Sequence, residues 1–249
     1  MRILATILCI DCKVVQSYGF SNYKIIGDPG IVVKHLDAWQ VDEIVLLQLD
    51  NSSSNLLLNL ESINKVSTTP ITVGGGITSL QLVKELISSG ADRVCIQSLA
   101  FSNISEIFRI SDHFGGQAIT LKFDLRQPSR DSLSDWSLFR YDISLIPNIL
   151  SQLSRYDVDD LFFYNTSADG LIASPSFESF FKSYDLSKYS VILGGGLNPQ
   201  ITAEIYAHLG NSFKDLSLSY SNYFHQKELA NISILDSISA YVKHRLCNH

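Results

Sequence analysis

Two aspartates stand out because each follows a short apolar run that predicts a buried strand. Asp11 comes directly after residues 3–10, and Asp124 comes directly after residues 117–123. Two carboxylates in one site can divide the duties of general acid and general base when their surroundings separate their pKa values. The alternative for each aspartate is a helix cap or a surface salt bridge. The sequence therefore offers a candidate catalytic pair.

Two glycine triplets, at residues 74–76 and 194–196, each follow an apolar run and precede a segment of helical periodicity. Glycines at such a junction let the backbone approach an anion, and the free N–H groups at a helix N-terminus bind phosphate. A single triplet could be no more than a tight turn. Two triplets at matching places predict a ligand with two phosphate groups.

Short apolar runs alternate with longer helical segments along the chain, a pattern typical of βα units around a parallel sheet. The expected strands are residues 3–10, 43–49, 70–73, 93–97, 117–123, 161–165, 190–193 and 215–220. The expected helices are roughly residues 30–40, 54–66, 79–89, 103–113, 145–155, 175–184, 199–209 and 228–245. In the second helix, one apolar stripe is formed by Leu56, Leu60, Ile63 and Val66. Eight such units in 249 residues match the size of a (β/α)8 TIM barrel.

The chain also repeats itself at about half its length, which favours two half-barrels closing on each other. The echoed pairs are residues 41–46 with 158–163, residues 70–77 with 190–197, and Asp11 with Asp124. We therefore expect one α/β barrel domain over residues 1–249, with halves at approximately 1–114 and 115–249. Because barrel active sites lie at the carboxyl ends of the strands, Asp11 and Asp124 should face each other across the mouth. The other polar residues expected there are Gln48, Asp50, Gln97, Ser98, Asn165, Asp169 and Ser221.

Composition and charge exclude several classes of protein. The net charge of −6 and the lack of a basic patch argue against a nucleic-acid partner. No uncharged apolar stretch approaches the roughly 20 residues needed to cross a bilayer, so no membrane span is predicted. Cys9 and Cys12 have a redox-like spacing, but no second Cys or His pair stands at ligand spacing. Free thiols in a reducing cytoplasm, with no metal and no cofactor, are the expectation.

These motifs together resemble the cyclase subunit of imidazole glycerol phosphate synthase, the HisF-like enzymes of histidine biosynthesis. The matching motifs are Cys9-Ile10-Asp11, Gly27-Asp28-Pro29, Thr72-Val73-Gly74-Gly75-Gly76-Ile77, Gly90-Ala91-Asp92-Arg93-Val94, Phe114-Gly115, Phe123-Asp124 and Ala168-Asp169-Gly170. The resemblance covers nearly the whole chain and implies a duplicated (β/α)8 barrel. The isomerase of the same pathway shares the barrel and the glycines, but the start of the chain and the strand before Asp124 are more similar to the cyclase.

The resemblance implies that ammonia, released by a HisH-like glutaminase partner at the N-terminal face, crosses the barrel to a two-phosphate ribotide, which is cleaved and cyclised. It implies that Asp11 and Asp124 are the catalytic acid and base. The implied phosphate sites are Gly75, Gly76, Gln97 and Ser98 at one end, and Asp169, Gly170, Gly195, Gly196 and Ser221 at the other. The implied ammonia gate and docking residues are Glu43, Arg93, Asp160 and Asp92.

Some family positions differ in this sequence. The family has a Lys-Asp-Gly-Arg stretch after its first aspartate, whereas here three residues are missing after Lys13, and Gln16 replaces a functional lysine. The gate arginine becomes Ala5, and Gln48 stands in place of an aspartate. Retained docking residues beside an altered substrate loop also fit a divergent paralogue that channels ammonia for amidation of a surface-glycan sugar. Both functions stay open at this point.

Overall fold

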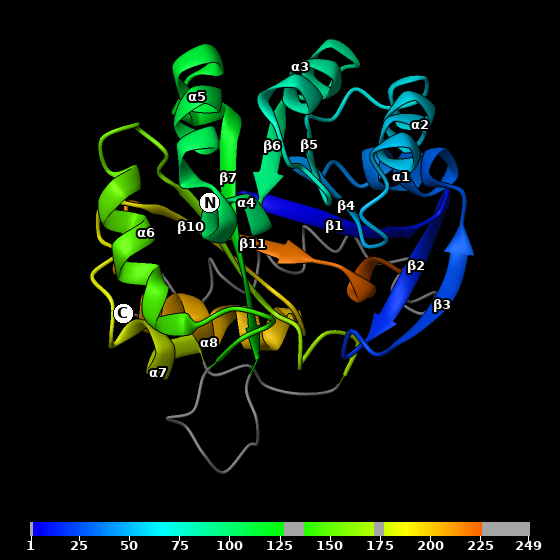
Figure 1. Ribbon diagram of the computed structural model, residues 1–249. Helices are drawn as coiled ribbons and strands as arrows, with labels where there is room; N and C mark the ends of the chain where they lie inside the picture. The colour runs from blue at the N-terminus through cyan, green and yellow to red at the C-terminus, as the bar shows by residue number, and fades with distance from the viewer. Residues whose placement is uncertain (1, 127–136, 172–176, 226–249) are drawn as a thin grey trace.

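The computed structural model describes residues 2–126, 137–171 and 177–225, in which strands and helices alternate (Figure 1). The strands are β1 (Ile3–Ile10), β2 (Lys13–Tyr18), β3 (Asn22–Gly27), β4 (Glu43–Gln48), β5 (Ile71–Gly74), β6 (Arg93–Ile96), β7 (Ile119–Arg126), β8 (Ser137–Leu138), β9 (Asp160–Asn165), β10 (Ser190–Gly194) and β11 (Asp215–Tyr220). The α-helices are α1 (Pro29–Ala38), α2 (Ser53–Asn64), α3 (Leu80–Ser88), α4 (Ser98–Ser102), α5 (Ile104–Phe114), α6 (Ile146–Leu153), α7 (Phe177–Phe181) and α8 (Pro199–Leu209). Short 3-10 helices are η1 (Gly116–Ala118), η2 (Ile143–Leu145) and η3 (Asn222–His225).

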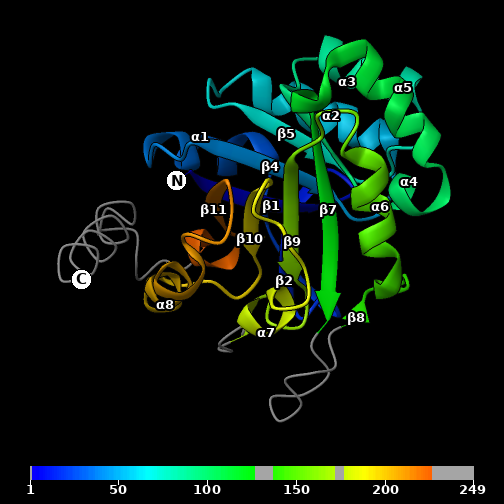
Figure 2. The ribbon, with the colours of Figure 1, turned by 90° about the vertical axis from the view of Figure 1, so that its left-hand side faces the viewer.

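Eight of these strands form a closed parallel barrel. The order around it is β1, β4, β5, β6, β7, β9, β10 and β11, and β11 pairs with β1 through Ile3 and Leu218. Helices lie outside the strands, as the view in Figure 2 shows for α1, α2, α3, α5 and α6. The predicted (β/α)8 barrel is confirmed. The eighth expected helix, at residues 228–245, lies outside the described residues, as do residues 172–176 before α7.

The apolar residues of the barrel form two cores because each strand is buried on both faces. The outer core fills the space between strands and helices, and the inner core fills the barrel itself. The inner core contains Leu4, Leu8, Val45, Leu47, Cys95, Phe162, Tyr164 and Ile192. In β1 the alternation of side chains therefore sends Leu4 and Leu8 into the barrel and sends Ala5, Ile7 and Cys9 toward the helices.

Helix α2 shows how the sequence sets a helix and its packing. The helix begins at Ser52, whose hydroxyl accepts a hydrogen bond from the backbone N–H of Asn55 at 3.2 Å. Its stripe of Leu56, Leu60 and Ile63 is fully buried against the barrel. Val66 was expected in the same stripe, but the helix ends at Asn64 and Val66 is 44% exposed. The stripe thus ends one turn earlier than its periodicity predicts.

A hairpin that the periodicity of the sequence does not predict separates β1 from α1. Strands β2 and β3 pair antiparallel with each other, and β2 pairs antiparallel with β1 (Figure 1). The residues of β3 from Asn22 to Ile26 are exposed. We call this element the β2–β3 hairpin; its tip residues, near Gly19 and Phe20, reach back over the barrel mouth. No helix within the described ranges is both long and apolar enough to cross a membrane.

Candidate functional site

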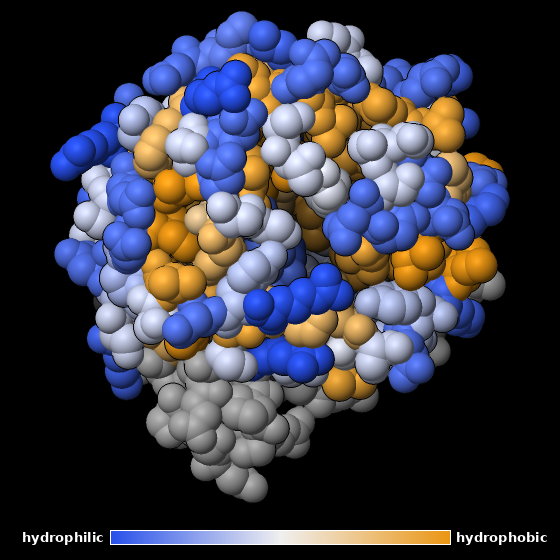
Figure 3. Space-filling model, viewed as in Figure 1, coloured by the Kyte–Doolittle hydropathy of each residue, from blue (hydrophilic) through white to orange (hydrophobic). Residues whose placement is uncertain are grey.

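A pocket of about 190 Å³ opens at the carboxyl ends of β4, β5, β6 and β7. The space-filling view shows a hollow near the middle of one face, bordered by hydrophilic and hydrophobic residues (Figure 3). The pocket is lined by Phe20, Tyr23, Leu47, Gln48, Leu49, Asn51, Gly75, Gly76, Ile77, Cys95, Gln97, Ser98, Lys122, Asp124, Phe139, Arg140 and Tyr141. It therefore brings together Asp124 and all four residues expected at the first phosphate site, and it places them at the predicted end of the barrel.

The first glycine turn has the geometry that only glycine tolerates well. Gly75 and Gly76 have φ angles of 106° and 67°, and a Cβ on Gly75 would lie 2.0 Å from the carbonyl oxygen of Gln48. Close packing alone thus requires glycine here. Within the described chain, neither the Gly75 N–H nor the Gly76 N–H donates a hydrogen bond, and both residues line the pocket. Two unpaired N–H groups facing a cavity are also suited to an anion.

Asp124 shares the pocket with a lysine that is absent from the predicted site. The ammonium of Lys122 forms an ion pair with the Asp124 carboxylate, and both side chains are buried on the inward face of β7. The same ammonium lies 5.1 Å from the ring centre of Tyr164. Side chains two residues apart on a strand point to the same face, so the spacing of Lys122 and Asp124 predicts their pairing. Burial of the Cys95 thiol nearby raises its pKa to about 12, which keeps this pocket residue uncharged.

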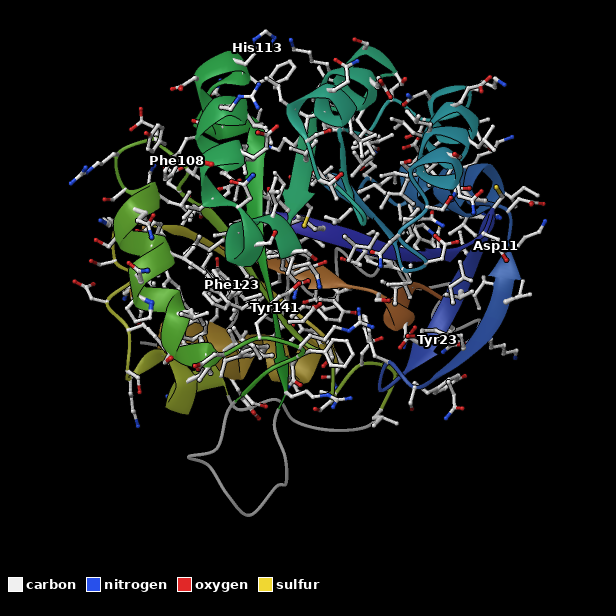
Figure 4. The ribbon with its side chains drawn as sticks, viewed as in Figure 1. Asp11, Tyr23, Phe108, His113, Phe123 and Tyr141 are labelled. Carbon is white, nitrogen blue, oxygen red and sulfur yellow. The ribbon has the colours of Figure 1, made fainter. Side chains whose placement is uncertain are left out.

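Asp11 does not join this site. It forms, with Cys12, the tight turn between β1 and β2, where its φ is 52° and its side chain is exposed. Its backbone carbonyl accepts hydrogen bonds from Gln48 and Asn59 at 2.9 and 3.2 Å. Figure 4 shows Asp11 at the edge of the molecule, well away from Phe123 and Tyr141. The expectation that Asp11 faces Asp124 across the mouth was wrong, and a catalytic role for Asp11 stays a prediction without geometric support.

The register of the sheet identifies the true counterpart of Asp124. In one half, Leu8 pairs with Leu47 of β4; in the other, Asp124 pairs with Tyr164 of β9. Leu8 is fully buried in the inner core. A shift of three residues in the comparison with the cyclase family removes the apparent gap after Lys13 and puts the family's first aspartate at Leu8. Asp11 then matches the aspartate of the Lys-Asp-Gly-Arg stretch, which is a turn.

The same shift corrects the expected gate at the other end of the barrel. Ala5 faces the helices, whereas Arg2 contacts Glu43 at 2.8 Å and Asp160 at 3.4 Å. Arg93 also forms an ion pair with Asp160, and Thr72 donates a hydrogen bond to Glu43 at 2.6 Å. We call Arg2, Glu43, Arg93 and Asp160 the entrance cluster. The replacement of the gate arginine by Ala5 was therefore a wrong prediction, because the arginine is present as Arg2.

The entrance cluster adjoins a groove of about 550 Å³ on the N-terminal face of the barrel. Its lining includes Arg2, Glu43, Arg93 and Asp92 together with the apolar Phe114 and Ile87. Asp92 is exposed, and its carboxylate accepts a hydrogen bond from the backbone N–H of Ile71 at 2.7 Å. Asp92 thus has a local structural role in addition to any docking role.

The histidine biosynthesis protein family model matches residues 2–206 of the chain. The chain belongs to this family. The "Imidazole glycerol phosphate synthase subunit HisF" of Dictyoglomus turgidum is 25% identical over 203 residues, which are 78% of this chain and 79% of the relative. The "Putative imidazole glycerol phosphate synthase subunit hisF2" of Campylobacter jejuni is 26% identical over 210 residues, which are 79% of this chain and 80% of the relative. The protein of the same name from Prochlorococcus marinus is 33% identical over 135 residues, or 49% of this chain and about half (52%) of the relative. The chain is therefore HisF-like, and the modest identities are those of a divergent paralogue.

In this HisF-like chain the second expected phosphate site is covered by the β2–β3 hairpin. The N–H of Gly19 donates to the carbonyl of Asp169 at 2.7 Å, and the Asn222 side chain donates to the carbonyl of Ser17 at 2.7 Å. A Cβ on Gly170 would lie 2.0 Å from that same carbonyl oxygen. None of the residues expected at this site, Asp169, Gly170, Gly195, Gly196 and Ser221, lines the pocket.

The covered region contains buried polar groups with incomplete hydrogen bonding. Burial raises the pKa of Asp169 to about 6, although hydrogen bonds from Tyr164, at 2.7 Å, and from Ser17 counteract part of this effect. The pKa of Tyr164 is also raised, by burial and by the Asp169 charge. Asp169 Oδ2, Ser221 Oγ and Asn222 Oδ1 have no hydrogen-bond partner among the described residues. Such atoms usually mark water or a ligand that completes the site.

Three further residues of the HisF-like pocket could not be assigned from sequence motifs. Tyr23 comes from the β2–β3 hairpin and Tyr141 from the segment after β8 (Figure 4), and Arg140 precedes Tyr141 in that segment. Their segments lie far apart in the sequence and carry no periodic signal. Within the residues that the structure describes, no group of three His, Cys, Asp or Glu side chains could hold a metal ion.

Proposed function

We propose that this HisF-like protein is the barrel subunit of a glutamine amidotransferase, receiving ammonia at its N-terminal face and using it at the mouth. The entrance cluster carries the proposal. It holds Glu43 and Asp160, which are 4% and 5% exposed, in ion pairs with two arginines at the end of the barrel opposite the pocket. Buried ion pairs add little net stability, so their presence favours a functional role.

The barrel interior suits a neutral molecule such as ammonia. Beyond Arg2 of the entrance cluster, the inward side chains of β1 are Leu4, then Thr6, then Leu8. The hydroxyl of Thr6 forms a hydrogen bond with that of Ser219 at 2.5 Å, and Phe162 also lies in the inner core. An apolar lining opposes the passage of an ion far more than that of a neutral amine. Ammonia would emerge beside Lys122 and Asp124 at the floor of the pocket, where Asp124 can act as the base.

The acceptor of the ammonia is the point on which the two candidate functions differ. The retained Asp124 and the open Gly75–Gly76 turn favour the ribotide cyclase reaction of the family. The leucine at the position of the first aspartate and the covered second phosphate site favour a different acceptor, such as a surface-glycan sugar. Because two of the ribotide's expected contacts are missing from the pocket, we favour amidation of a sugar.

Association with a HisH-like glutaminase encoded in the same gene neighbourhood tests the proposed function. We expect the two proteins to copurify, and we expect Asp92→Asn, which keeps a hydrogen-bond acceptor for Ile71, to weaken the complex about tenfold. Glu61→Lys, on the exposed surface of α2, is the matched control and should leave the affinity unchanged. The proposal would be contradicted if the wild-type proteins failed to associate even at a protein concentration 100-fold above that at which stable complexes form.

An assay of turnover with ammonium salt distinguishes the ribotide from a sugar as the acceptor of ammonia. Under the favoured function the wild-type protein does not consume the two-phosphate ribotide, alone or with the glutaminase. Ribotide cleavage that depends on both ammonium and Asp124 would establish the cyclase reaction instead. In both cases Glu43→Gln should lower glutamine-dependent transfer while leaving transfer from free ammonium intact, since ammonium reaches the mouth from solution.

A further inference from the structure

We propose that the pocket binds a ligand that is anionic at one end only, and that Lys122 and Arg140 recognise this end. The inference rests on the proposed function, because it names the chemical class of the acceptor bound at the same mouth. It assigns a binding role to two residues that no family motif includes. A sugar with a single phosphate group is a ligand of this class.

Lys122 supplies a cation at the floor of the pocket. Its side chain is 5% exposed, and its ammonium sits between the Asp124 carboxylate and the rings of Tyr164 and Phe162, at 5.1 and 6.0 Å from the ring centres. Asp124 is the one hydrogen-bond acceptor that it contacts in the described parts of the chain. An ammonium has three N–H donors, so the others remain for a ligand atom.

Arg140 supplies a second cation to the lining of the same pocket. Its guanidinium stacks on the ring of Phe139, 4.9 Å from the ring centre, and the residue is exposed with a φ of 75°. No carboxylate within the described ranges pairs with it. Among the described residues, the pocket lining therefore holds two cations and the single carboxylate of Asp124, a net positive charge. A phosphate or carboxylate group is the complementary ligand chemistry.

The two expected phosphate sites show why the ligand would be anionic at one end only. The free N–H groups of Gly75 and Gly76 line the same pocket as Lys122 and Arg140, so this one pocket contains the anion-binding groups. The second expected phosphate site lies outside the pocket lining; it is closed by the hairpin carbonyl of Ser17 against Gly170 and contains the buried Asp169 carboxylate. A second phosphate there would meet backbone oxygen and a carboxylate, both of which repel it.

The aromatic side chains of the lining indicate the character of the ligand's body. Phe20 and Tyr23 from the hairpin and Phe139 and Tyr141 from the segment after β8 line the pocket. Tyr141 stacks on Phe101 with ring centres 4.1 Å apart, which fixes its orientation. Aromatic faces of this kind pack against the C–H faces of a sugar ring as well as against planar rings. A phosphorylated sugar satisfies both the charge and the lining.

Calorimetric titration of the full chain with ribose 5-phosphate and fructose 1,6-bisphosphate, at fixed ionic strength, tests this inference. We expect ribose 5-phosphate to bind at one site per chain, and the bisphosphate to bind no more than about threefold more tightly. Arg140→Gln should weaken both ligands about tenfold, because hydrogen bonds to charged groups are strong. Lys188→Gln is the matched control, since Lys188 also lies over a neighbouring ring, Tyr189, but lies outside the pocket.

Testing Lys122 requires a variant that still folds, because its charge is buried in an ion pair with Asp124. Lys122→Met with Asp124→Asn removes both charges together, and it should weaken ribose 5-phosphate at least tenfold with an unchanged circular dichroism spectrum. Bisphosphate binding a hundredfold tighter than ribose 5-phosphate, and lost in Ser221→Ala, would show a two-ended site and overturn the inference. Unchanged affinity in both charge variants, or no binding of either sugar phosphate, would also overturn it. These titrations measure binding without the glutaminase and without turnover. Their result can therefore be interpreted even if the proposed ammonia transfer is disproved.

Discussion

The two halves of the barrel share a backbone plan but carry different side chains at the mouth. Gly75 and Gly76 have their counterparts in Gly195 and Gly196, and all four have positive φ angles between 67° and 106°. At the inward position where the second half has Asp124, the first half has Leu8. The repeat is therefore kept where the backbone needs it and lost where the chemistry is carried.

The two halves also differ in how far their mouth loops are covered. The turn of the first half opens into the pocket, whereas the loop of Asp169 and Gly170 in the second half lies beneath the β2–β3 hairpin. One half thus supplies an open anion-binding wall, and the other supplies the acid–base group and the buried lysine. A symmetric scaffold has become an asymmetric site, which fits a ligand with two different ends.

Replacing each of the two aspartates in turn should reveal the largest difference, because only Asp124 lies in the pocket. In an ammonium-dependent assay with whichever acceptor supports turnover, Asp124→Asn should lower kcat by about 10² to 10⁴, the range for loss of a general acid or base. Asp11→Asn should change kcat less than about threefold, because the side chain is exposed in a turn. Equal losses in the two variants would contradict the assignment of a single catalytic carboxylate.

Breaking the buried ion pair of the second half should be the next largest effect. Lys122→Met leaves the Asp124 carboxylate buried without a partner, which costs about 3–5 kcal/mol of the free energy of unfolding. Thermal unfolding should then occur at least about 6 °C lower. The double variant Lys122→Met with Asp124→Leu makes the pair apolar, with a leucine as at Leu8, and should return to within about 1 kcal/mol of wild type. Lys214→Met, which breaks the exposed pair with Asp159, should have no measurable effect.

The fold could be predicted from the sequence because its signals are periodic and repeated. Apolar runs of strand length alternate with helical stripes such as Leu56, Leu60 and Ile63, and the glycine triplets recur at half the chain length. These features follow from backbone requirements, and a barrel is the arrangement that satisfies all of them. The Gly75–Gly76 turn and Asp124 were located at the mouth for the same reason.

The facing of β1 could not be predicted because the strand is apolar on both sides. Residues 3–10 contain no polar alternation, and a shift of one residue exchanges the inward and outward sets. That ambiguity led to the assignment of Asp11 to the mouth and of Ala5 to the gate. The salt bridges of Arg2 resolve it. The hairpin that covers Asp169 also carries no strong turn motif, so the closure of the second half was not foreseen.

The buried carboxylate under the hairpin should make stability depend on pH. Burial raises the pKa of Asp169 from 3.8 to about 6, so the folded chain holds a proton that the unfolded chain releases between those values. Its contribution is therefore fully present below pH 4 and is lost as the pH rises through 6, by about 3 kcal/mol in total. In thermal unfolding, wild type should gain stability relative to Asp169→Asn as the pH falls from 6 to 4. A constant difference between the two proteins would show that the hairpin leaves Asp169 in contact with water.

The smallest effect should come from two inward threonines that are equally buried but differently bonded. Thr72 in the first half donates to Glu43 of the entrance cluster, whereas Thr120 in the second half has a hydroxyl without a partner among the described residues; each is 1% exposed. Thr72→Val should cost about 1–3 kcal/mol because it leaves a buried carboxylate short of a donor. Thr120→Val keeps the shape and removes an unsatisfied group, so unfolding free energy should stay within about 0.5 kcal/mol of wild type or rise. A large loss in Thr120→Val, measured by urea unfolding, would mean that its hydroxyl binds water inside the barrel. The polar path from the entrance cluster would then extend into the second half as well.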